Sequence, residues 1–194
     1  MEKFHKAKVI FLDRDGVINK DPMGSRYGYV TRWDEFKFLP GVKMAVKKLT
    51  LAGYKIYVIS NQAGISKGYF TRDALKEITS RMTGELEKSG GKIKKVFYCT
   101  HKNEDNCDCR KPKAGLFKKV LKKEKVSIEN SFFIGDSIRD VQAGKTAGCE
   151  TILVLSGKEK LADRKQWQTK PDYVKRNLLD AVNWVLKSER MKKR

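Results

Sequence analysis

Short apolar runs alternate with amphipathic segments along most of the chain. The runs are rich in β-branched and aromatic residues and are almost continuously apolar, which is typical of strands buried in a parallel sheet. They cover residues 8–12, 55–59, 95–98, 131–134 and 151–155. The pattern therefore predicts five strands in the interior of the fold.

The segments between these runs carry apolar residues at helical spacing. The first segment stops at Gly53, and Thr71 is placed to cap a helix that runs to about Lys88. The predicted helices cover residues 42–49, 71–88, 116–121, 138–147 and 178–186. Strands that alternate with helices imply a doubly wound parallel α/β sheet, which binds its ligands beyond the carboxyl ends of the strands.

Two connections are longer than such a sheet requires. Residues 14–40 and 99–113 lack helical periodicity, and each segment follows directly after a predicted strand. Connections of this length in a compact domain usually carry function. We expect a single domain over residues 1–186 without a large cap domain, followed by a frayed basic tail over residues 187–194.

Composition narrows the class of protein. Of the 194 residues 40% are hydrophobic, which is enough to fill a core and excludes disorder over most of the chain. No apolar run approaches the roughly 18 residues of a membrane span, and the N-terminus lacks the apolar core of a signal peptide. We therefore expect a cytoplasmic protein without a membrane partner, and we expect it to be a monomer.

Lysine and arginine outnumber the acidic residues by 43 to 23, which gives a formal net charge of +20. A basic surface can bind nucleic acid, an anionic membrane or a phosphorylated substrate. Here the lysines are scattered among glutamates along helix-like segments, and no basic cluster is interleaved with aromatic residues. A solvated basic surface is the simpler interpretation, and we do not expect nucleic acid as a partner.

Acidic residues follow two of the predicted strands. Asp13 and Asp15 come directly after the first strand, and their spacing lets both side chains enter one crevice. One of them could be a nucleophile and the other a general acid or base, although the alternative for such a sequence is a plain turn. Asp136 leaves a later strand at a comparable position, so that it could share a hard cation such as Mg²⁺ with Asp13.

Two further polar groups accompany these acids. Ser60 and Asn61 follow another predicted strand, and their hydroxyl and amide groups can hydrogen-bond to phosphate oxygens. A polar turn is the alternative for this segment. Asp140 lies one helical turn after Asp136, where an acidic residue can also serve only to stabilise a helix N-terminus.

The strongest local motif is Cys99-x-His101-x₅-Cys107-x-Cys109. Three thiols and one imidazole form a complete tetrahedral set with no open position, which is typical of structural rather than catalytic Zn²⁺. The spacing of each pair places both of its members on the same side of an extended chain. The sequence therefore predicts a zinc loop, which leads directly into an Arg-Lys-Pro sequence.

Four motifs resemble, in the same order, those of the haloacid dehalogenase superfamily of phosphohydrolases. They are Asp-x-Asp-Gly-Val from Asp13, Ser-Asn-Gln from Ser60, Arg-Lys-Pro from Arg110 and Gly-Asp-x-x-x-Asp from Gly135. They span about three quarters of the chain. The fuller strings and the zinc loop are similar to the branch that contains heptose bisphosphate phosphatases and histidinol-phosphate phosphatases.

The resemblance implies an aspartyl-phosphate mechanism. Asp13 would attack phosphorus, and Asp15 would protonate the leaving oxygen and later deprotonate the attacking water. Mg²⁺ would be held by the Asp13 carboxylate, the backbone carbonyl of Asp15 and Asp136.

The resemblance also implies how the substrate is held. Ser60, Asn61 and Lys111 would bind the transferring phosphoryl group, and Arg110 would contact the rest of the substrate. The expected substrate is a small phosphorylated metabolite, namely the heptose 1,7-bisphosphate of bacterial envelope-sugar synthesis, cleaved at its 7-phosphate. Histidinol phosphate is the close alternative substrate, and a nucleic-acid 3′-phosphate is a distant one. The alternative to an enzyme is a binding module, in which the carboxylates would have no catalytic role.

The chain departs from this branch at two positions. Lys67 stands where many members have arginine before Gly-Tyr, and Ser137 stands where heptose phosphatases often have lysine after Gly-Asp. These changes bear on the substrate rather than on the chemistry. A second phosphate group would need further cations beside Lys111. The candidates are Arg110, Lys67, Arg26 and Arg32.

Overall fold

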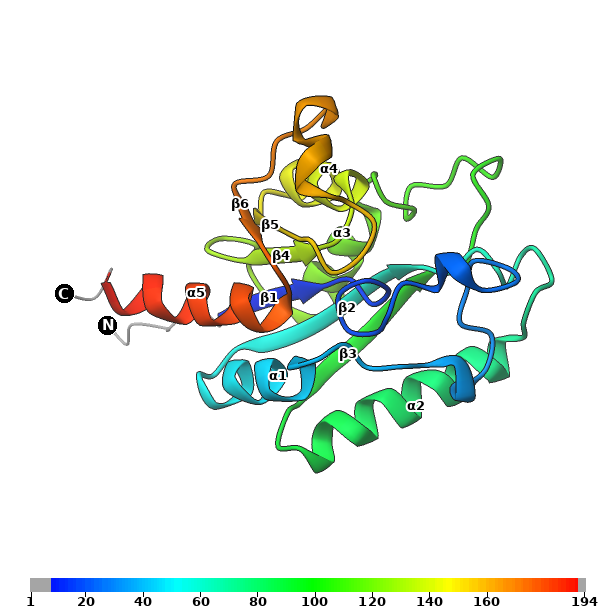
Figure 1. The fold of residues 1–194 in the computed structure, drawn as a ribbon, viewed down its shortest axis with the longest axis horizontal. Coiled ribbons are helices and arrows are strands. Elements are labelled where there is room, and N and C mark those ends of the chain that lie inside the picture. Colours follow the sequence, from blue (N-terminus) through cyan, green and yellow to red (C-terminus); the bar gives the residue numbers. More distant parts are fainter. Residues whose placement is uncertain (1–7, 192–194) are drawn as a thin grey trace.

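The computed structural model describes residues 8–191, which form a six-stranded sheet between two layers of helices (Figure 1). All neighbouring strands are parallel, in the order β3-β2-β1-β4-β5-β6. The strands are β1 (Val9–Leu12), β2 (Lys55–Asn61), β3 (Ile93–Cys99), β4 (Phe132–Gly135), β5 (Glu150–Val154) and β6 (Tyr173–Lys175). The predicted doubly wound parallel sheet is confirmed.

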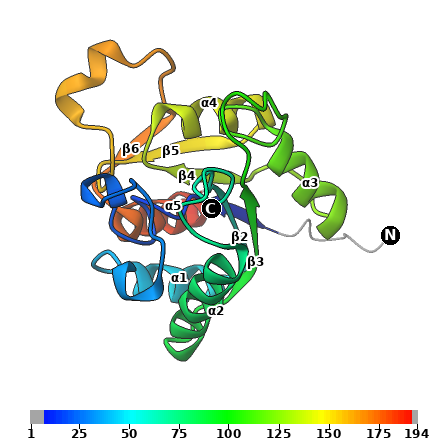
Figure 2. The same cartoon turned by 90° about the vertical axis from the view of Figure 1, so that its right-hand side faces the viewer.

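The two helical layers explain why the strands are apolar throughout. Helices α1, α2 and α5 cover one face of the sheet, and α3 and α4 cover the other (Figure 2). Within β1, Ile10 packs with the first layer and Phe11 with the second, so both faces of the strand are buried. The helices are α1 (Val42–Leu51), α2 (Arg72–Lys88), α3 (Gly115–Glu124), α4 (Ile138–Ala147) and α5 (Leu178–Met191).

Local signals set most helix ends where the sequence predicts them. The Thr71 hydroxyl accepts a hydrogen bond from Ala74 N at 3.1 Å and caps α2, which ends at Lys88 as expected. Helix α5, in contrast, continues to Met191, so residues 187–191 are helical rather than a frayed tail. Residues 192–194 lie outside the described part of the chain. The assignment of a single domain to residues 1–186 stays a prediction.

Strand β6 was not predicted. It has three partly buried residues at the edge of the sheet and ends on Lys175, so it is too short and too polar to give an apolar or alternating pattern. Its partner β5 supplies the backbone hydrogen bonds that make it a strand.

Long connections surround the carboxyl edge of the sheet. The segments over residues 13–41, 100–114 and 155–172 contain only short 3₁₀ turns, at Pro22–Gly24, Trp33–Glu35 and Leu161–Gln166. No large cap domain is present in the described residues, as expected. None of the helices within residues 8–191 is long and apolar enough to cross a membrane.

Candidate active site

The carboxyl ends of three neighbouring strands bring polar side chains together at one edge of the sheet. Strand β1 lies between β2 and β4, so Asp13 after β1 comes next to Ser60 at the end of β2 and to Asp136 after β4. This edge encloses a cavity of about 130 Å³. The predicted site residues on its wall are Asp13, Asp15, Ser60, Asn61, Arg110 and Lys111.

Lys111 is the central cation of this cavity. Its side chain is only 3% exposed, and Nζ lies 2.9 Å from Asp13 Oδ1 and 2.7 Å from Asp140 Oδ1. It also donates a hydrogen bond to the carbonyl of Ile59 at 3.1 Å. Burial opposes the charge of Lys111, but the two carboxylates outweigh burial and raise its pKa. Lys111 is therefore charged at neutral pH.

Three buried carboxyl groups lie close together here, and two of them, Asp13 and Asp140, pair with Lys111. The carboxylates of Asp13, Asp136 and Asp140 offer oxygens within 4.8 Å of one another. Burial raises the pKa of Asp13 to about 6, with Lys111 opposing the shift and Asp140 adding to it. Burial and the nearby charges of Asp140 and Asp13 raise the pKa of Asp136 well above its ordinary value. The cluster carries more negative charge than its surroundings compensate, and its hard oxygen donors fit a divalent cation such as Mg²⁺.

Asp140 has a different environment from the other two acids. Burial disfavours its charge, but Lys111 and hydrogen bonds from Ser137 lower the pKa of the Asp140 carboxyl. Its Oδ2 accepts hydrogen bonds from Ser137 Oγ at 2.6 Å and from Ser137 N at 3.1 Å, which also caps α4. Asp140 therefore serves as a helix-terminal acid, as its position suggested, and at the same time holds Lys111.

Glycines let the backbone approach Asp136 closely. A Cβ atom on Gly16 would lie 2.2 Å from Asp136 Oδ2, and one on Gly157 would lie 2.1 Å from the same oxygen. Gly16 also has a φ of +77°, which other residues rarely adopt. The glycine of the Asp-x-Asp-Gly motif is thus required by its conformation and by its contact with Asp136. Lys158 N donates to Asp136 Oδ2 at 2.9 Å from the other side.

The carboxylate of Asp15 is held by three side chains that the sequence analysis did not select. Arg14, which is fully buried, donates to both of its oxygens, at 2.9 Å and 3.0 Å from one Nη atom. Asn19 Nδ2 donates to Oδ1 at 2.8 Å, and Gln62 Nε2 donates to Oδ2 at 2.7 Å. Arg14 and Gln62 lie inside the motifs that carried the family resemblance, and Asn19 follows the first motif by two positions, so the motifs were the available signal. They fix the orientation of Asp15 at the cavity.

Asn61 and Lys111 are linked across 50 positions of the sequence. Asn61 Nδ2 donates to Lys111 O at 3.1 Å, and its Oδ1 accepts from Lys111 N at 3.1 Å. The side chain of Asn61 is therefore engaged with the backbone of Lys111, whereas sequence reasoning placed its amide on the phosphoryl group. Ser60 is buried and accepts a hydrogen bond from Gln62 Nε2 at 3.3 Å.

The Cys-His motif forms a compact group next to this cavity. The sulfur atoms of Cys99 and Cys109 lie 3.2 Å apart, and those of Cys99 and Cys107 lie 3.6 Å apart. His101 Nδ1 is 3.2 Å from Cys109 Sγ and 3.7 Å from Cys99 Sγ. A tetrahedral zinc with Zn–S bonds of about 2.3 Å separates its sulfur ligands by about 3.8 Å. The four side chains predicted to bind zinc are thus brought together at nearly the required spacing.

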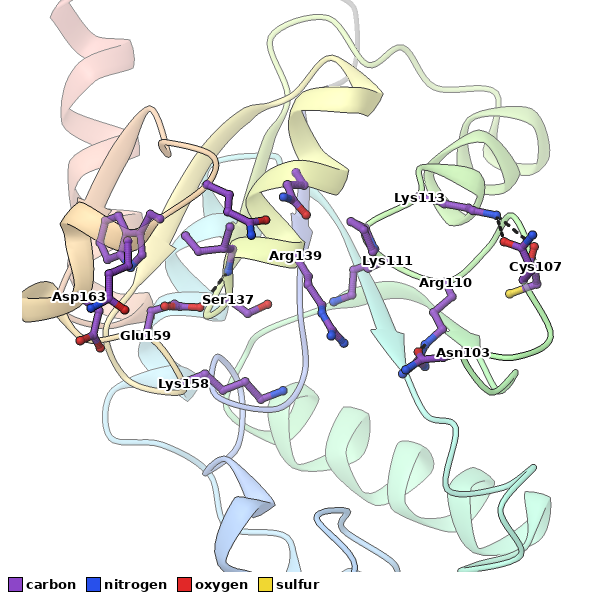
Figure 3. Close-up of a pocket in the computed structure, with 17 residues that line it drawn as sticks. Asn103, Cys107, Arg110, Lys111, Lys113, Ser137, Arg139, Lys158, Glu159 and Asp163 are labelled. Atoms are coloured by element: carbon purple, nitrogen blue, oxygen red, sulfur yellow. Dashed lines mark hydrogen bonds between the residues drawn. The ribbon is translucent and has the colours of Figure 1, made fainter.

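The loop of this group also orients Arg110. Arg110 Nε donates to Asn103 Oδ1 at 2.6 Å, and Nη1 donates to His101 O at 3.3 Å. The side chain extends along the wall of a second cavity of about 810 Å³, as Figure 3 shows. The Cys-His loop thus positions the first residue of the basic pair that follows it.

The other cations expected around a second phosphate group do not line either cavity. Lys67 Nζ lies 5.9 Å from the ring centroids of Tyr29 and Tyr69, and Arg32 pairs with Glu35 at 3.3 Å. Arg26 lies over the ring of Tyr27 at 5.1 Å. These three side chains lie on the outer loops, beside aromatic rings and a carboxylate. Their contact with a second phosphate group stays a prediction.

Comparison with known proteins agrees with this geometry. The chain is 37% identical, over 186 residues, to the D-glycero-beta-D-manno-heptose-1,7-bisphosphate 7-phosphatase of Haemophilus ducreyi, covering 92% of this chain and 98% of that protein. The chain belongs to the haloacid dehalogenase-like phosphatases. The enzyme of the same name from Neisseria meningitidis serogroup A is 36% identical over 181 residues, covering 92% of this chain and 95% of that protein.

A family model and a solved structure also match this haloacid dehalogenase-like phosphatase. The family model of HAD-hydrolase-like proteins matches residues 108–181. The D,D-heptose 1,7-bisphosphate phosphatase of B. bronchiseptica, crystallised with magnesium and phosphate, superimposes with a TM-score of 0.84 at 33% identity, covering 93% of this chain and 99% of that one. The resemblance stated from the motifs is confirmed, and the protein is a magnesium-dependent phosphatase.

Proposed function

We propose that this phosphatase removes the 7-phosphate of D-glycero-beta-D-manno-heptose 1,7-bisphosphate. The observation that carries the proposal is the buried group of Asp13, Lys111 and Asp140 at the mouth of a cation-lined cavity, with the Cys-His loop beside it. Relatives that match the chain over nearly its full length bear the name of this activity. In this proposal one phosphate group of the substrate lies at the acid cluster, where it is cleaved, and the other lies in the larger cation-lined cavity.

The covalent step is assigned to Asp13. Its carboxylate oxygen attacks phosphorus, the new O–P bond forms and the bond from phosphorus to the sugar oxygen breaks. Lys111, 2.9 Å from Asp13, neutralises charge on the phosphoryl oxygens, and Ser60 offers a hydroxyl on the same cavity wall.

Proton transfer is assigned to Asp15. Its carboxyl group gives a proton to the leaving sugar oxygen and then takes one from the water that hydrolyses the aspartyl-phosphate, which releases phosphate and restores Asp13. The donors on Arg14, Asn19 and Gln62 keep the carboxylate directed toward the cavity during both steps.

The residues that would hold Mg²⁺ are the carboxylates of Asp13 and Asp136 and the backbone carbonyl of Asp15. In the turn after β1 the backbone N–H groups donate hydrogen bonds to Arg14 O and Asn19 O, and none of these hydrogen bonds goes to Asp15 O. When bound, Mg²⁺ supplies positive charge beside the transferring phosphoryl group.

Zn²⁺ is assigned a structural role at Cys99, His101, Cys107 and Cys109, because four protein ligands leave no open position. A loop with three reduced thiols suits a reducing compartment, so we also infer a cytoplasmic location. The expectation of a monomer stays a prediction.

Mg²⁺ is expected to raise the Tm of metal-depleted protein, and to do so more at pH 7 than at pH 4. Burial raises the pKa of Asp13 from an ordinary 3.8 to about 6. Without metal, the folded state thus keeps a proton that the unfolded chain has released, and the free energy of unfolding falls as the pH rises through about 6. Mg²⁺ binds the ionised carboxylate of Asp13, so the stabilising effect of Mg²⁺ grows as the pH rises from about 4 to above 6.

The measurement is thermal unfolding with and without Mg²⁺ across this pH range. Asp136→Asn is the informative variant, because it removes one proposed ligand and should abolish most of the shift. An equal shift at both pH values, or an unchanged shift in Asp136→Asn, would contradict this assignment of the metal ligands.

A heptose 1,7-bisphosphate is expected to be hydrolysed with a higher kcat/KM than histidinol phosphate, and Arg110→Ala should reduce this preference by about tenfold or more. The reason is that Arg110 offers a charged donor at the wall of the larger cavity, where the second phosphate group would lie. Both substrates are assayed side by side with Mg²⁺. Lys118→Ala, which removes an exposed charge on α3, is the control and should leave the preference as it is.

The substrate assignment has clear competing outcomes. A preference of the unmodified protein for histidinol phosphate, or for an oligonucleotide with a 3′-phosphate, would overturn the heptose substrate and leave the phosphatase mechanism standing. The absence of phosphate release from every ester tested would contradict the mechanism as well.

A further inference from the structure

A groove with a volume of about 630 Å³ opens at the edge of the sheet, between α2, the carboxyl end of β3 and α3. This edge groove has the size of pockets that bind small molecules. Strand β3 is the edge strand, and Figure 2 shows α2 and α3 on opposite sides of it. None of the described residues lines both the edge groove and either of the two cavities around Lys111. The edge groove is therefore separate from the site of the substrate.

Apolar side chains from three segments form part of the wall of the edge groove. They are Ile65 in the loop after β2, Leu75 on α2 and Leu116 on α3. Leu75 and Leu116 are also buried in the core, so their positions are fixed by packing. An organic ligand can bury an apolar part here without a rearrangement of the fold.

The same wall carries three cations, and none of the described residues that line it is acidic. Arg72 and Lys76 lie on α2, and Lys119 lies on α3. All three side chains are exposed, and within residues 8–191 none of them forms a hydrogen bond or an ion pair. Glu77, which follows Lys76 in the chain, pairs with Arg81 at 3.2 Å instead. An anion in the edge groove would thus be attracted by three cations without displacing an existing partner.

Tyr98, the residue before the last one of β3, lines the edge groove with a hydroxyl group that has a defined partner. This hydroxyl lies 2.8 Å from Thr79 Oγ1, and Thr79 lines the edge groove as well. Thr79 Oγ1 donates its own proton to the carbonyl of Leu75 at 2.7 Å, so Tyr98 is the donor in the pair. A ligand in the edge groove would contact this pair directly.

Behind Tyr98 lies the arginine that holds the catalytic acid. The guanidinium carbon of Arg14 is 5.9 Å from the centre of the Tyr98 ring, and one Nη atom of Arg14 donates to both oxygens of Asp15. Burial opposes the charge of Arg14, but Asp15 and Tyr98 outweigh burial and raise the pKa of Arg14. Two side chains therefore connect the edge groove with Asp15.

We propose that the edge groove binds a small organic anion with an apolar body, and that its occupation slows proton transfer by Asp15 through Tyr98 and Arg14. The coupling rests on the proposed function, in which Asp15 is the group that transfers the proton. A ligand against the pair of Tyr98 and Thr79 shifts the Tyr98 hydroxyl, and with it the guanidinium group that orients Asp15. Because an acid–base group acts only within hydrogen-bond reach of its target, a small shift of Asp15 lowers the rate.

The binding test uses anilinonaphthalene sulfonate, an aromatic anion that fluoresces in apolar sites, and protein saturated with Zn²⁺ and Mg²⁺. Lys76→Gln and Lys119→Gln should each raise the Kd of the dye by about fivefold, and the double variant by about 25-fold. Octanoate, which has an apolar body, should displace the dye. Inorganic phosphate, which has none and fits the catalytic cavity, should not displace it.

Lys118→Gln is the matched control for the binding test. It removes the same charge from the same helix, and Lys118 is exposed and does not line the edge groove. The Kd of the dye should stay within about twofold of that of the unmodified protein, because a change in overall charge alone has little effect at physiological salt.

The coupling test follows hydrolysis of p-nitrophenyl phosphate, whose turnover still needs Asp15 to deprotonate the attacking water. Saturating dye should lower kcat by about fivefold or more and leave KM within about twofold, because the dye does not occupy the substrate site. Tyr98→Phe keeps the ring and removes the hydroxyl group. This variant should bind the dye within about twofold of the unmodified protein and lose most of the effect of the dye on kcat.

The outcomes separate this proposal from the proposed function. Equal affinity of the dye for the unmodified protein and the double variant, or a dye that raises KM alone, would overturn the site. Loss of dye binding as the protein dimerises at higher concentration would assign the edge groove to a second copy of the chain and overturn it too. Binding as expected without a change in kcat would overturn the coupling to Asp15. If no ester is hydrolysed, the proposed function is wrong, and the fluorescence still decides whether the edge groove binds the anion.

Discussion

Asp13→Asn is expected to abolish turnover, with kcat lowered by at least about 10⁴-fold, while the protein stays folded. The amide has nearly the same shape as the carboxylate, but it cannot attack phosphorus to form an aspartyl-phosphate. Removing one of three crowded carboxylates should not destabilise the fold, because burial already raises the pKa of Asp13 to about 6 and disfavours its charge. Phosphate release in the presence of Mg²⁺ and the Tm are the two measurements.

A second variant distinguishes the nucleophile from the proton-transfer group. Asp15→Asn should lower kcat by about 10²- to 10⁴-fold, because general acid–base catalysis contributes that much. With p-nitrophenyl phosphate, whose leaving group needs no protonation, Asp15→Asn should accumulate phosphorylated protein, and the modified residue should be Asp13. Asp73→Asn, an exposed acid on α2, serves as the control and should retain activity.

The covalent mechanism would be wrong if Asp13→Asn kept Mg²⁺-dependent hydrolysis close to that of the unmodified protein. It would also be wrong if the phosphoryl group trapped in Asp15→Asn were found on a residue other than Asp13. A loss of folding in Asp13→Asn would contradict the structural argument that its carboxylate is not needed for stability.

Cys107→Ser is expected to lose the zinc, to lower the Tm by about 10 °C or more and to lose most activity. Three remaining ligands bind zinc far more weakly than a complete Cys₃His set. Activity should fall because Arg110 is held by Asn103 and by the carbonyl of His101, and Lys111 follows directly in the chain. Elemental analysis should find about one zinc per chain in the unmodified protein and much less in the variant.

Cys149→Ser is the matched control for the thiol chemistry. Cys149 is buried and accepts a hydrogen bond from Ser131 Oγ at 3.2 Å, and it lies outside the Cys-His group. This variant should keep its zinc, although the added polarity costs some stability. Protein prepared without chelator that contains no stoichiometric zinc would contradict the structural metal site.

Most of the sheet could be predicted from the sequence for a specific physical reason. Helices on both faces require strands that are apolar on both sides, and such strands are visible as uninterrupted apolar runs. The five predicted runs lie within two residues of β1 to β5. Strand β6 could not be found in this way, because its backbone pairing with β5, rather than its side chains, makes it a strand.

Positions of chemical groups relative to strand ends could also be predicted. Asp13, Ser60 and Asp136 each come directly at or after a strand end, and parallel strands present these ends at one edge of the sheet. The Cys-His group could be predicted without any knowledge of the sheet. Its four members lie within eleven residues, close enough for local chain geometry to bring them together.

The amino-acid sequence by itself thus determined the parallel sheet, the acid cluster and the Cys-His group, because each depends on periodicity or on short spacing. Only the tertiary structure decided how distant groups pair. The link between Asn61 and Lys111 crosses 50 residues, and the hold of Gln62 on Asp15 crosses 47. Which cations line the catalytic cavity depends likewise on the path of the connections around it: Lys158 lines the cavity, whereas Lys67, which was chosen from the sequence, lies beside the rings of Tyr29 and Tyr69.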